Sequence, residues 1–411
     1  MSVLDWLFDS DPAIRWQVLR DLLHAPPEIV GAERARTATE GWGAKLLALQ
    51  GEDGQWAGGA CFPEHSLNWR DENQGQPWTS TLPTLQLLHG FGVDPNSERV
   101  RHAVELVKHH CRWEHAGQPF FAGEVEPCIN GRTVALGAYF GLNVDSIVNR
   151  LVSEQLEDGG WNCEAENGSV RSSFATTINV LEGLLAYERA TGGSPESIAA
   201  RRRGEEYLLE RRLFRRKSTG EIVNSTWMQF SFPTHWHYDV LRALDYFCSA
   251  GEKPDLRVDE AIDLLRSKRQ SDGTLLLENT HPGKIYFPLE DGDGRPSRWN
   301  TLRALRVLNW YENNDAGAAF AFQENRVAPN QSPKVGFSSL IALTPEGAIS
   351  GVHLPPPSRL PSSESTCRSA EKNRLHHCFN PGSHLLSRNS VGRLKPTARG
   401  TEDGPGGRSG Q

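Results

Sequence analysis

Hydrophobic residues recur with helical spacing from residue 12 to residue 312 of the chain. Val100, Ala103, Val104 and Val107 follow the i, i+3, i+4, i+7 spacing that places side chains on one face of a helix. Such a helix is buried on one face and solvated on the other. Segments such as 299–311 are richer in apolar and aromatic residues, which is typical of a helix buried on all sides. The pattern predicts an all-α fold in which outer and inner helices alternate.

The two kinds of helix pair into five hairpins followed by a last helix, which gives about eleven helices. The predicted hairpins are 12–24 with 33–50, 78–91 with 97–112, 129–141 with 145–156, 172–190 with 195–213, and 235–249 with 257–270, and the last helix is 299–312. Alternating inner and outer helices form either a closed ring or an open solenoid. An open solenoid needs polar capping repeats, whereas the last predicted helix is strongly aromatic, so we favour closure.

Three segments at the ends of outer helices repeat one motif. They read QGEDGQW at 50–56, QLEDGGW at 155–161 and, in degenerate form, RQSDGTL at 269–275. Glycine permits the turn, and Trp56 and Trp161 are expected to lie over the helix junction. The motif resembles the QW repeat of the squalene cyclases and related turns in the protein prenyltransferase β subunits. This resemblance covers residues 30–312 and implies an α/α toroid.

The composition changes near residue 326. All 12 Trp and all 7 Tyr lie at or before Tyr311, whereas residues 327–411 are rich in Ser, Pro and Gly. Such a segment cannot bury enough apolar surface to offset the entropy lost on ordering. We therefore predict a toroid domain at 1–326 and a disordered low-complexity tail at 327–411.

Charge and composition exclude several classes of function. The chain has 44 Lys+Arg and 51 Asp+Glu, a formal net charge of -7, which argues against binding to nucleic acid. No run of 18 apolar residues is present to form a transmembrane segment. The first residues lack the basic flank of a signal peptide, and the 7 cysteines are scattered, which together favour a cytoplasmic protein with reduced thiols.

In a toroid of this kind, the loops that lead into the inner helices meet at one end of the central cavity. Trp78, Trp236, Trp299 and Arg298 lie at these predicted entries. A cavity rimmed by aromatic side chains is suited to a hydrophobic small molecule, and aromatic faces stabilise carbocations. Arg298 is expected either to pair with Asp239 or to bind an anionic group.

The resemblance to squalene cyclases implies an aspartic acid, in an Asp-x-Asp-Asp motif, that protonates an alkene. The sequence contains no such motif. Asp239 and His237, at the start of a predicted inner helix, are the alternative candidates for acid and base chemistry. Asp239 is either a helix cap or a buried acid with a raised pKa.

The resemblance to prenyltransferases implies a zinc ion bound by an Asp-x-Cys pair and a later histidine. Glu126-Pro127-Cys128 has the form of that pair, but Ala175 and Thr176 occupy the place of the histidine. Cys128, Cys163 and His237 would together supply two sulfurs and one nitrogen and leave a fourth zinc position open. The alternative is that the two cysteines are small core residues.

The sequence therefore predicts a toroid that acts on a hydrophobic, isoprenoid-type small molecule in a central cavity, either with or without the help of zinc. The alternative is a non-catalytic toroid that binds a lipid or a protein partner.

Overall fold

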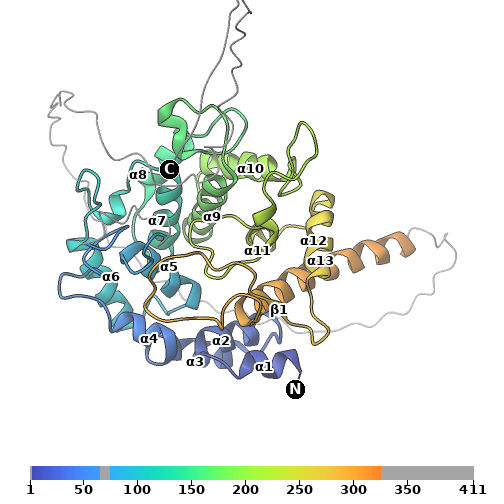
Figure 1. Cartoon of the computed structure of the whole chain (residues 1–411), viewed down its shortest axis with the longest axis horizontal. Helices are drawn as coiled ribbons and strands as arrows, with labels where there is room; N and C mark the ends of the chain where they lie inside the picture. The colour runs from blue at the N-terminus through green and yellow to red at the C-terminus, as the bar shows by residue number, and fades with distance from the viewer. Residues whose placement is uncertain (1, 65–74, 325–411) are drawn as a thin grey trace, which may run out of the picture. The chain divides into compact units, whose positions relative to one another are not determined.

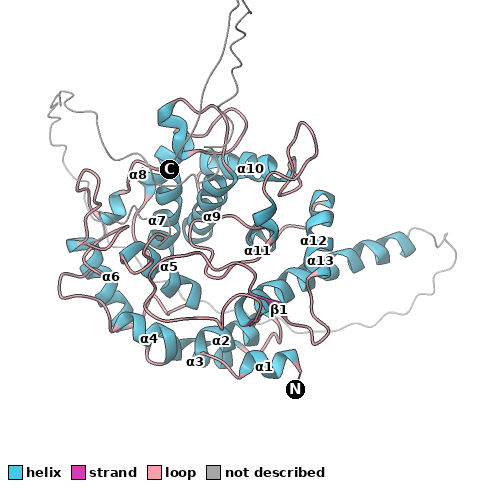
Figure 2. Cartoon of the chain, in the orientation of Figure 1, coloured by secondary structure: helices cyan, strands magenta, loops and turns pink. Residues whose placement is uncertain are grey.

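The computed structural model describes residues 2–64 and 75–324, which are helical over most of their length (Figures 1 and 2). The helices are α1 (Val3–Phe8), α2 (Pro12–Asp21), α3 (Pro27–Ala35), α4 (Gly41–Leu47), α5 (Thr81–Phe91), α6 (Glu98–His110), α7 (Pro127–Tyr139), α8 (Asp145–Ser153), α9 (Phe174–Thr191), α10 (Pro195–Leu209), α11 (Val240–Ala250), α12 (Asp259–Ser267) and α13 (Arg298–Glu324). Two short strands, β1 (Leu275–Leu276) and β2 (Pro296–Ser297), pair in antiparallel fashion. Within the described residues, no helix combines the length and the apolar composition needed to cross a membrane.

Six helices contact one another in succession and close a ring. Helix α2 contacts α5, α5 contacts α7, α7 contacts α9, α9 contacts α11, α11 contacts α13, and α13 returns to α2 (Figure 1). Around this ring, α4 packs against α2 and α5, α8 against α7, α10 against α9, and α12 against α11. The domain is an α/α toroid. The predicted closed ring is confirmed, and the open solenoid is excluded.

The helices differ from the predicted ones near the amino terminus. The predicted outer helix at 33–50 is broken into α3, a short 3₁₀ turn and α4. The break lies at Gly41, whose φ of 63° is not compatible with a continuous right-handed helix. Helix α1 is an additional element, and Ser2 and Asp5 cap its first turn reciprocally. The predicted tail at 327–411 lies outside the described residues.

Buried polar side chains join most neighbouring inner helices. The contacts are Trp16 Nε1 to Phe91 O across α2 and α5 (2.8 Å), Arg132 Nη1 to Gln86 Oε1 across α5 and α7 (3.3 Å), Arg242 to Glu182 across α9 and α11 (2.6 Å), Arg303 to Asp245 across α11 and α13 (3.2 Å), and Arg306 to Asp21 across α13 and α2 (3.0 Å). Charged groups that are removed from water need such partners. The interior of the ring is therefore more polar than the sequence pattern suggested.

Helices α7 and α9 meet through glycines instead. A Cβ atom on Gly183 of α9 would collide with the carbonyl oxygen of Gly131 on α7 and would lie 3.0 Å from its carbonyl carbon. A Cβ atom on Gly131 would likewise lie 2.7 Å from the Cα atom of Val180. The two backbones are in direct contact, so neither position has room for a side chain.

The two strong copies of the repeated motif make the same hydrogen bonds. In the first copy, Trp56 Nε1 donates to Leu46 O (2.7 Å) and Gln50 Nε2 donates to Ala103 O (2.9 Å). In the second copy, the corresponding bonds run from Trp161 to Leu151 O (2.7 Å) and from Gln155 to Ala200 O (2.8 Å). Both tryptophans are fully buried. Each motif therefore fastens one outer helix to the next, and its tryptophan is structural.

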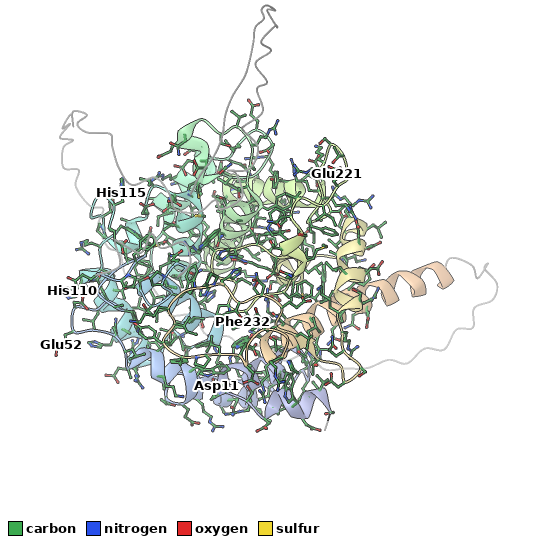
Figure 3. The ribbon with its side chains drawn as sticks, in the orientation of Figure 1. Asp11, Glu52, His110, His115, Glu221 and Phe232 are labelled. Carbon is green, nitrogen blue, oxygen red and sulfur yellow. The ribbon has the colours of Figure 1, made fainter. Side chains whose placement is uncertain are left out.

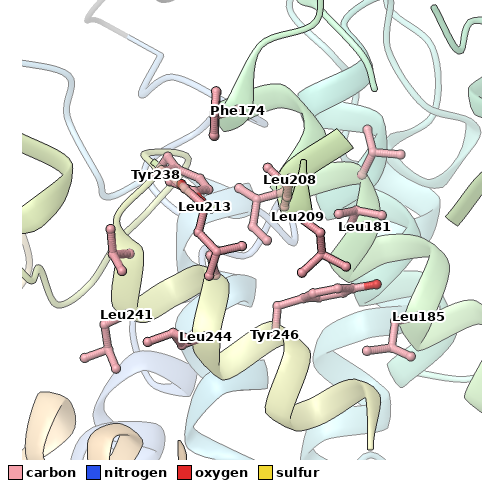
Figure 4. Close-up of a cluster of buried hydrophobic side chains, with 14 of the residues drawn as sticks. Phe174, Leu181, Leu185, Leu208, Leu209, Leu213, Tyr238, Leu241, Leu244 and Tyr246 are labelled. Carbon is pink, nitrogen blue, oxygen red and sulfur yellow. The ribbon is translucent and has the colours of Figure 1, made fainter. Parts of the chain in front are cut away.

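The hydrophobic core consists of two clusters. One cluster joins the helices from α7 to α12 and includes the side chains shown in Figure 4, among them Leu181, Leu208, Leu244 and Tyr246. The other cluster joins α1 to α7 with the beginning of α13 and includes Trp299. Because α7 and α13 supply residues to both clusters, these two helices connect the two halves of the ring.

Candidate functional site

The structure brings three potential metal ligands together at the start of α7. One carboxylate oxygen of Glu126, the sulfur of Cys128 and the sulfur of Cys163 all lie within 4.8 Å of one another. Cys128 Sγ and Glu126 Oε2 are 3.5 Å apart. Among the described residues, this is the group of histidine, cysteine and acidic side chains with the geometry to hold a metal ion.

Local structure at two loop ends positions these ligands. Pro127 occupies the first turn of α7, where a missing N–H costs no helical hydrogen bond, so Glu126 and Cys128 flank the helix start. Cys163 follows Trp161 of the second repeated motif and begins a 3₁₀ turn. The hydroxyl of Thr176, in the first turn of α9, donates to Cys163 Sγ (3.5 Å). The turn of the second repeated motif therefore places Cys163 close to the start of α7.

The electrostatic environment of this cluster favours the neutral forms of its groups. Burial and, after it, the neighbouring carboxylate of Glu124 together raise the pKa of Glu126 to about 7. The hydrogen bond with Cys163, together with burial, holds the pKa of the Cys128 thiol well above its usual range. Potential anions packed at such distances repel one another once ionised, and a bound cation would reverse that effect.

His237 is not a member of this group of ligands. Its ring stacks on His281 with 3.6 Å between centroids and on Trp236 at 3.7 Å, and it meets the edge of Trp78 at 6.0 Å. Trp78 in turn stacks on His235 at 3.8 Å. The structure therefore brings His237, Trp78 and Trp236 together, as a separate aromatic cluster. The third potential ligand beside Cys128 and Cys163 is Glu126 instead.

Asp239 is the N-cap residue of α11. One of its carboxylate oxygens accepts the backbone N–H of Arg242 (2.7 Å), and the other accepts that of Ser231 (3.2 Å). Burial raises the pKa of Asp239, while the nearby positive charge of Arg303 acts in the opposite direction. Both expectations from the sequence, a helix cap and a buried acid with a raised pKa, therefore describe the same carboxyl group.

The structure places Trp299 and Arg298 in other surroundings. Trp299 is only 3% exposed and stacks on Phe232, with 4.4 Å between ring centroids; Phe232 is labelled in Figure 3. The guanidinium of Arg298 lies over the ring of Trp6 and donates to the carbonyl of Asp9 (3.0 Å). Arg298 is therefore bound to the amino-terminal segment of the ring, and the arginines that lie near Asp239 are Arg303 and Arg242.

Sequence reasoning missed two residues of this region. Arg132 lies one helical turn after Cys128 and donates from Nε to the carbonyl oxygen of Cys128 (3.3 Å). The i, i+4 spacing from Cys128 was the available signal for Arg132. His281 lies in the loop between β1 and β2, where no periodic pattern indicates that it reaches His237.

Three histidines in the interior of the ring are held neutral. Burial lowers the pKa of His89 and of His281 to about 4 and that of His237 to about 2. In an unfolded chain, histidine titrates near pH 6.5. Below that pH the unfolded chain binds protons that the folded protein does not bind. The free energy of unfolding should therefore decrease as the pH falls from about 6.5 to about 4.

Replacing His281 by glutamine tests this pH dependence. The variant lacks one of the histidines that take up a proton on unfolding, so its stability should depend less steeply on pH, by up to about 1.4 kcal/mol per pH unit between about pH 6 and 4.5. Urea unfolding at several pH values measures the slope. His115→Gln is the control, because His115 is exposed (Figure 3). Equal slopes for His281→Gln and the wild type would contradict the assignment.

Comparisons with known proteins find structural likeness but no family. No family model matches the chain, and no curated protein matches it. Among solved structures, the chain is similar to a variant of the type II terpene cyclase MstE from Scytonema, in complex with the substrate geranylgeranyl dihydroxybenzoate. The similarity covers 72% of this chain and 84% of that chain, with 15% sequence identity and a TM-score of 0.33. The toroid described above rests on the helix contacts of this chain itself.

Proposed function

We propose that this protein is a zinc-dependent enzyme that acts on an isoprenoid-type small molecule at the entry to its helical ring. The observation that carries the proposal is the convergence of Glu126, Cys128 and Cys163, whose ligand atoms lie within 4.8 Å of one another. These residues come from two separate segments, the start of α7 and the 3₁₀ turn at Cys163, and two of them are thiols, which are preferred ligands of zinc.

The residues fit a zinc ion in number and spacing. Zinc binds sulfur at about 2.3 Å and carboxylate oxygen at about 2.0 Å, so two such ligands of a tetrahedral ion lie about 3.5 Å apart. Cys128 Sγ and Glu126 Oε2 are separated by 3.5 Å. Three protein ligands leave the fourth position open, as in catalytic zinc sites. When bound, zinc would act as a Lewis acid and lower the pKa of a fourth ligand.

The surrounding side chains support binding of a partly apolar molecule. The faces of Trp78 and Trp236 belong to the aromatic cluster around His237, and both indole nitrogens have protein acceptors, Pro282 O and Gln76 Oε1. Aromatic faces held in this way offer a rigid surface to an isoprenoid chain and attract positive charge. This is the support for an isoprenoid-type substrate.

We propose His237 as the group that exchanges protons at this site and Asp239 as the residue that positions it. The Nδ1 atom of His237 is buried and has no hydrogen-bond partner among the described residues, so it is available to exchange a proton with a substrate. Both carboxylate oxygens of Asp239 already accept backbone N–H groups. We therefore assign Asp239 the task of fixing the loop that carries His237.

Metal analysis of the purified full chain tests the proposal. We expect about one zinc ion per wild-type chain and a loss of most of it in Cys128→Ala and Glu126→Gln, because two ligands hold zinc far more weakly than three. Cys248→Ala is the matched control, because Cys248 lies in α11 and its sulfur contacts the carbonyl oxygen of Arg306. A wild-type protein without zinc, or equal zinc in Cys128→Ala, would contradict the proposal and leave the non-catalytic toroid as the better hypothesis.

The substrate class has a separate test. Mass spectrometry of small molecules extracted from the native protein should detect a retained polyprenyl or other isoprenoid species. Extraction of only phospholipids or of no apolar molecule, in protein that holds zinc, would contradict the isoprenoid assignment without affecting the metal site.

A further inference from the structure

The guanidinium of Arg132 is buried without an anionic partner. Arg132 is 3% exposed, and its Nη2 atom has no hydrogen-bond partner. Its other nitrogens donate to two neutral acceptors, Cys128 O and Gln86 Oε1, both at 3.3 Å. None of the ion pairs found in the described residues includes Arg132. Buried charges in proteins are normally paired, because an unpaired buried charge is strongly destabilising.

The other buried arginines of the ring contrast with Arg132. Arg242 forms a paired contact with Glu182, at 2.8 Å and 2.6 Å. Arg303 pairs with Asp245 at 3.2 Å, and Arg306 pairs with Asp21 at 3.0 Å. Among the described residues, Arg132 is the member of this set that forms no ion pair with a carboxylate, although its charge acts on the nearby Glu126.

A second unpartnered atom lies in the same region. The buried Nδ1 atom of His237 also lacks a hydrogen-bond partner. The positive charge of Arg132 contributes to the lowered pKa of His237, after burial and the nearby His281 and Arg242, so the surroundings of this ring carry a positive potential. A neutral imidazole with its proton on Nδ1 is a hydrogen-bond donor. If His237 carries its proton on Nδ1, that atom and Arg132 Nη2 are two donors from different elements that lack an acceptor among the described residues.

Several residues of this region are partly exposed to solvent. Gln86, His237 and His281 keep an intermediate exposed fraction, although all three belong to the interior network of the ring. Glu126, six residues before Arg132 and part of the metal cluster, is also half-buried. A small group that enters beside the metal cluster can therefore approach Arg132 and His237.

We propose that the ligand of this toroid carries an oxyanion, a phosphate or a carboxylate, which Arg132 and His237 bind beside the Glu126–Cys128–Cys163 cluster. The inference rests on the proposed function for the location of the reacting group. It adds that the substrate is amphiphilic, with an apolar part against Trp78 and Trp236 and an anionic part at Arg132. A pure hydrocarbon would leave the Arg132 charge unpaired.

Calorimetric titration of the full chain with inorganic phosphate, and in parallel with acetate, tests this inference. We expect saturable binding of at least one of the two anions by the wild type. The binding should be weakened about tenfold or more in Arg132→Gln and largely retained in Arg132→Lys, because a lysine keeps the charge. Arg202→Gln is the control, because Arg202 forms an exposed ion pair with Glu252 on the outer surface. The anion that binds more tightly identifies the substrate group.

Three results would overturn the inference: no binding of either anion, equal binding in Arg132→Gln, or loss of binding in Arg202→Gln to the same degree. If Arg132→Gln does not fold, His237→Ala provides the same comparison. Phosphate or acetate binding is also measured in Cys128→Ala, which lacks a zinc ligand. Anion binding that persists in Cys128→Ala shows that the anion site is independent of the metal. Anion binding that is lost in Cys128→Ala but kept in Arg132→Gln assigns the anion to the metal and overturns the inference.

Discussion

Substitution of Gly183 by alanine is expected to destabilise the toroid by about 3 kcal/mol, which is at the upper end of the cost of overpacking a core. The new methyl group would collide with the carbonyl oxygen of Gly131 on the neighbouring helix. The obstacle is backbone, so no change of side-chain rotamer relieves it, and α7 and α9 must move apart. Helix α7 carries Cys128 of the candidate metal cluster, and α9 carries the hydroxyl of Thr176 that donates to Cys163.

Urea unfolding followed by circular dichroism measures this effect. Gly90→Ala is the matched control, since Gly90 also lies in an inner helix but a Cβ atom there meets nothing within 4 Å. That substitution should be neutral or stabilising by about 0.5 to 1 kcal/mol, because alanine is the better helix former. Equal stability of Gly183→Ala and the wild type would show that α7 and α9 are farther apart than the structure places them.

Replacement of Arg306 by methionine is expected to cost about 3 kcal/mol in the free energy of unfolding. Arg306 donates to Asp21 (3.0 Å) and Gln17 (3.1 Å) on α2 and lies 3.3 Å from Asp245 on α11. Without it, the Asp21 carboxylate keeps only the adjacent Arg20 as a cationic partner, in a largely buried position. The variant therefore loses the ion pairs that join the last inner helix to the first.

Two comparisons make the Arg306 result specific. Arg202→Met removes an exposed ion pair and should change stability by no more than about 1 kcal/mol. Adding Asp21→Asn to Arg306→Met should recover part of the loss, because the unpaired carboxylate is then neutral. If the loss in the free energy of unfolding of the double variant equals the sum of the losses of the two single variants, the ion pair does not close the ring.

The toroid was predictable from the sequence because its two helix types differ in composition. Outer helices such as α6 have one apolar face, whereas inner helices such as α9 are apolar on most of their surface. The boundary between α3 and α4 was not predictable in the same way. Apolar residues continue through the break, and only the left-handed conformation of Gly41 reveals it.

The candidate site was predictable in its parts rather than in its geometry. Sequence position showed that Cys128 and Cys163 lie near inner-helix entries, and the structure joins them. The choice between Glu126 and His237 as third ligand depended on how the loop before α11 folds, and hydrophobic periodicity does not describe loops. Arg298 illustrates the same limit: its neighbours on α1 are far away in the sequence and share no pattern with it.

The contact that completes the ring joins residues far apart in the chain, because Arg306 and Gln17 are separated by 289 positions. At ordinary rates of translation, helix α2 must wait on the order of tens of seconds for α13 to be synthesised. During that interval the surface of α2 that α13 will cover stays open to solvent and to other nascent chains. Completion of the domain is thus a late event in biosynthesis, and molecular chaperones have the greatest opportunity to act before it.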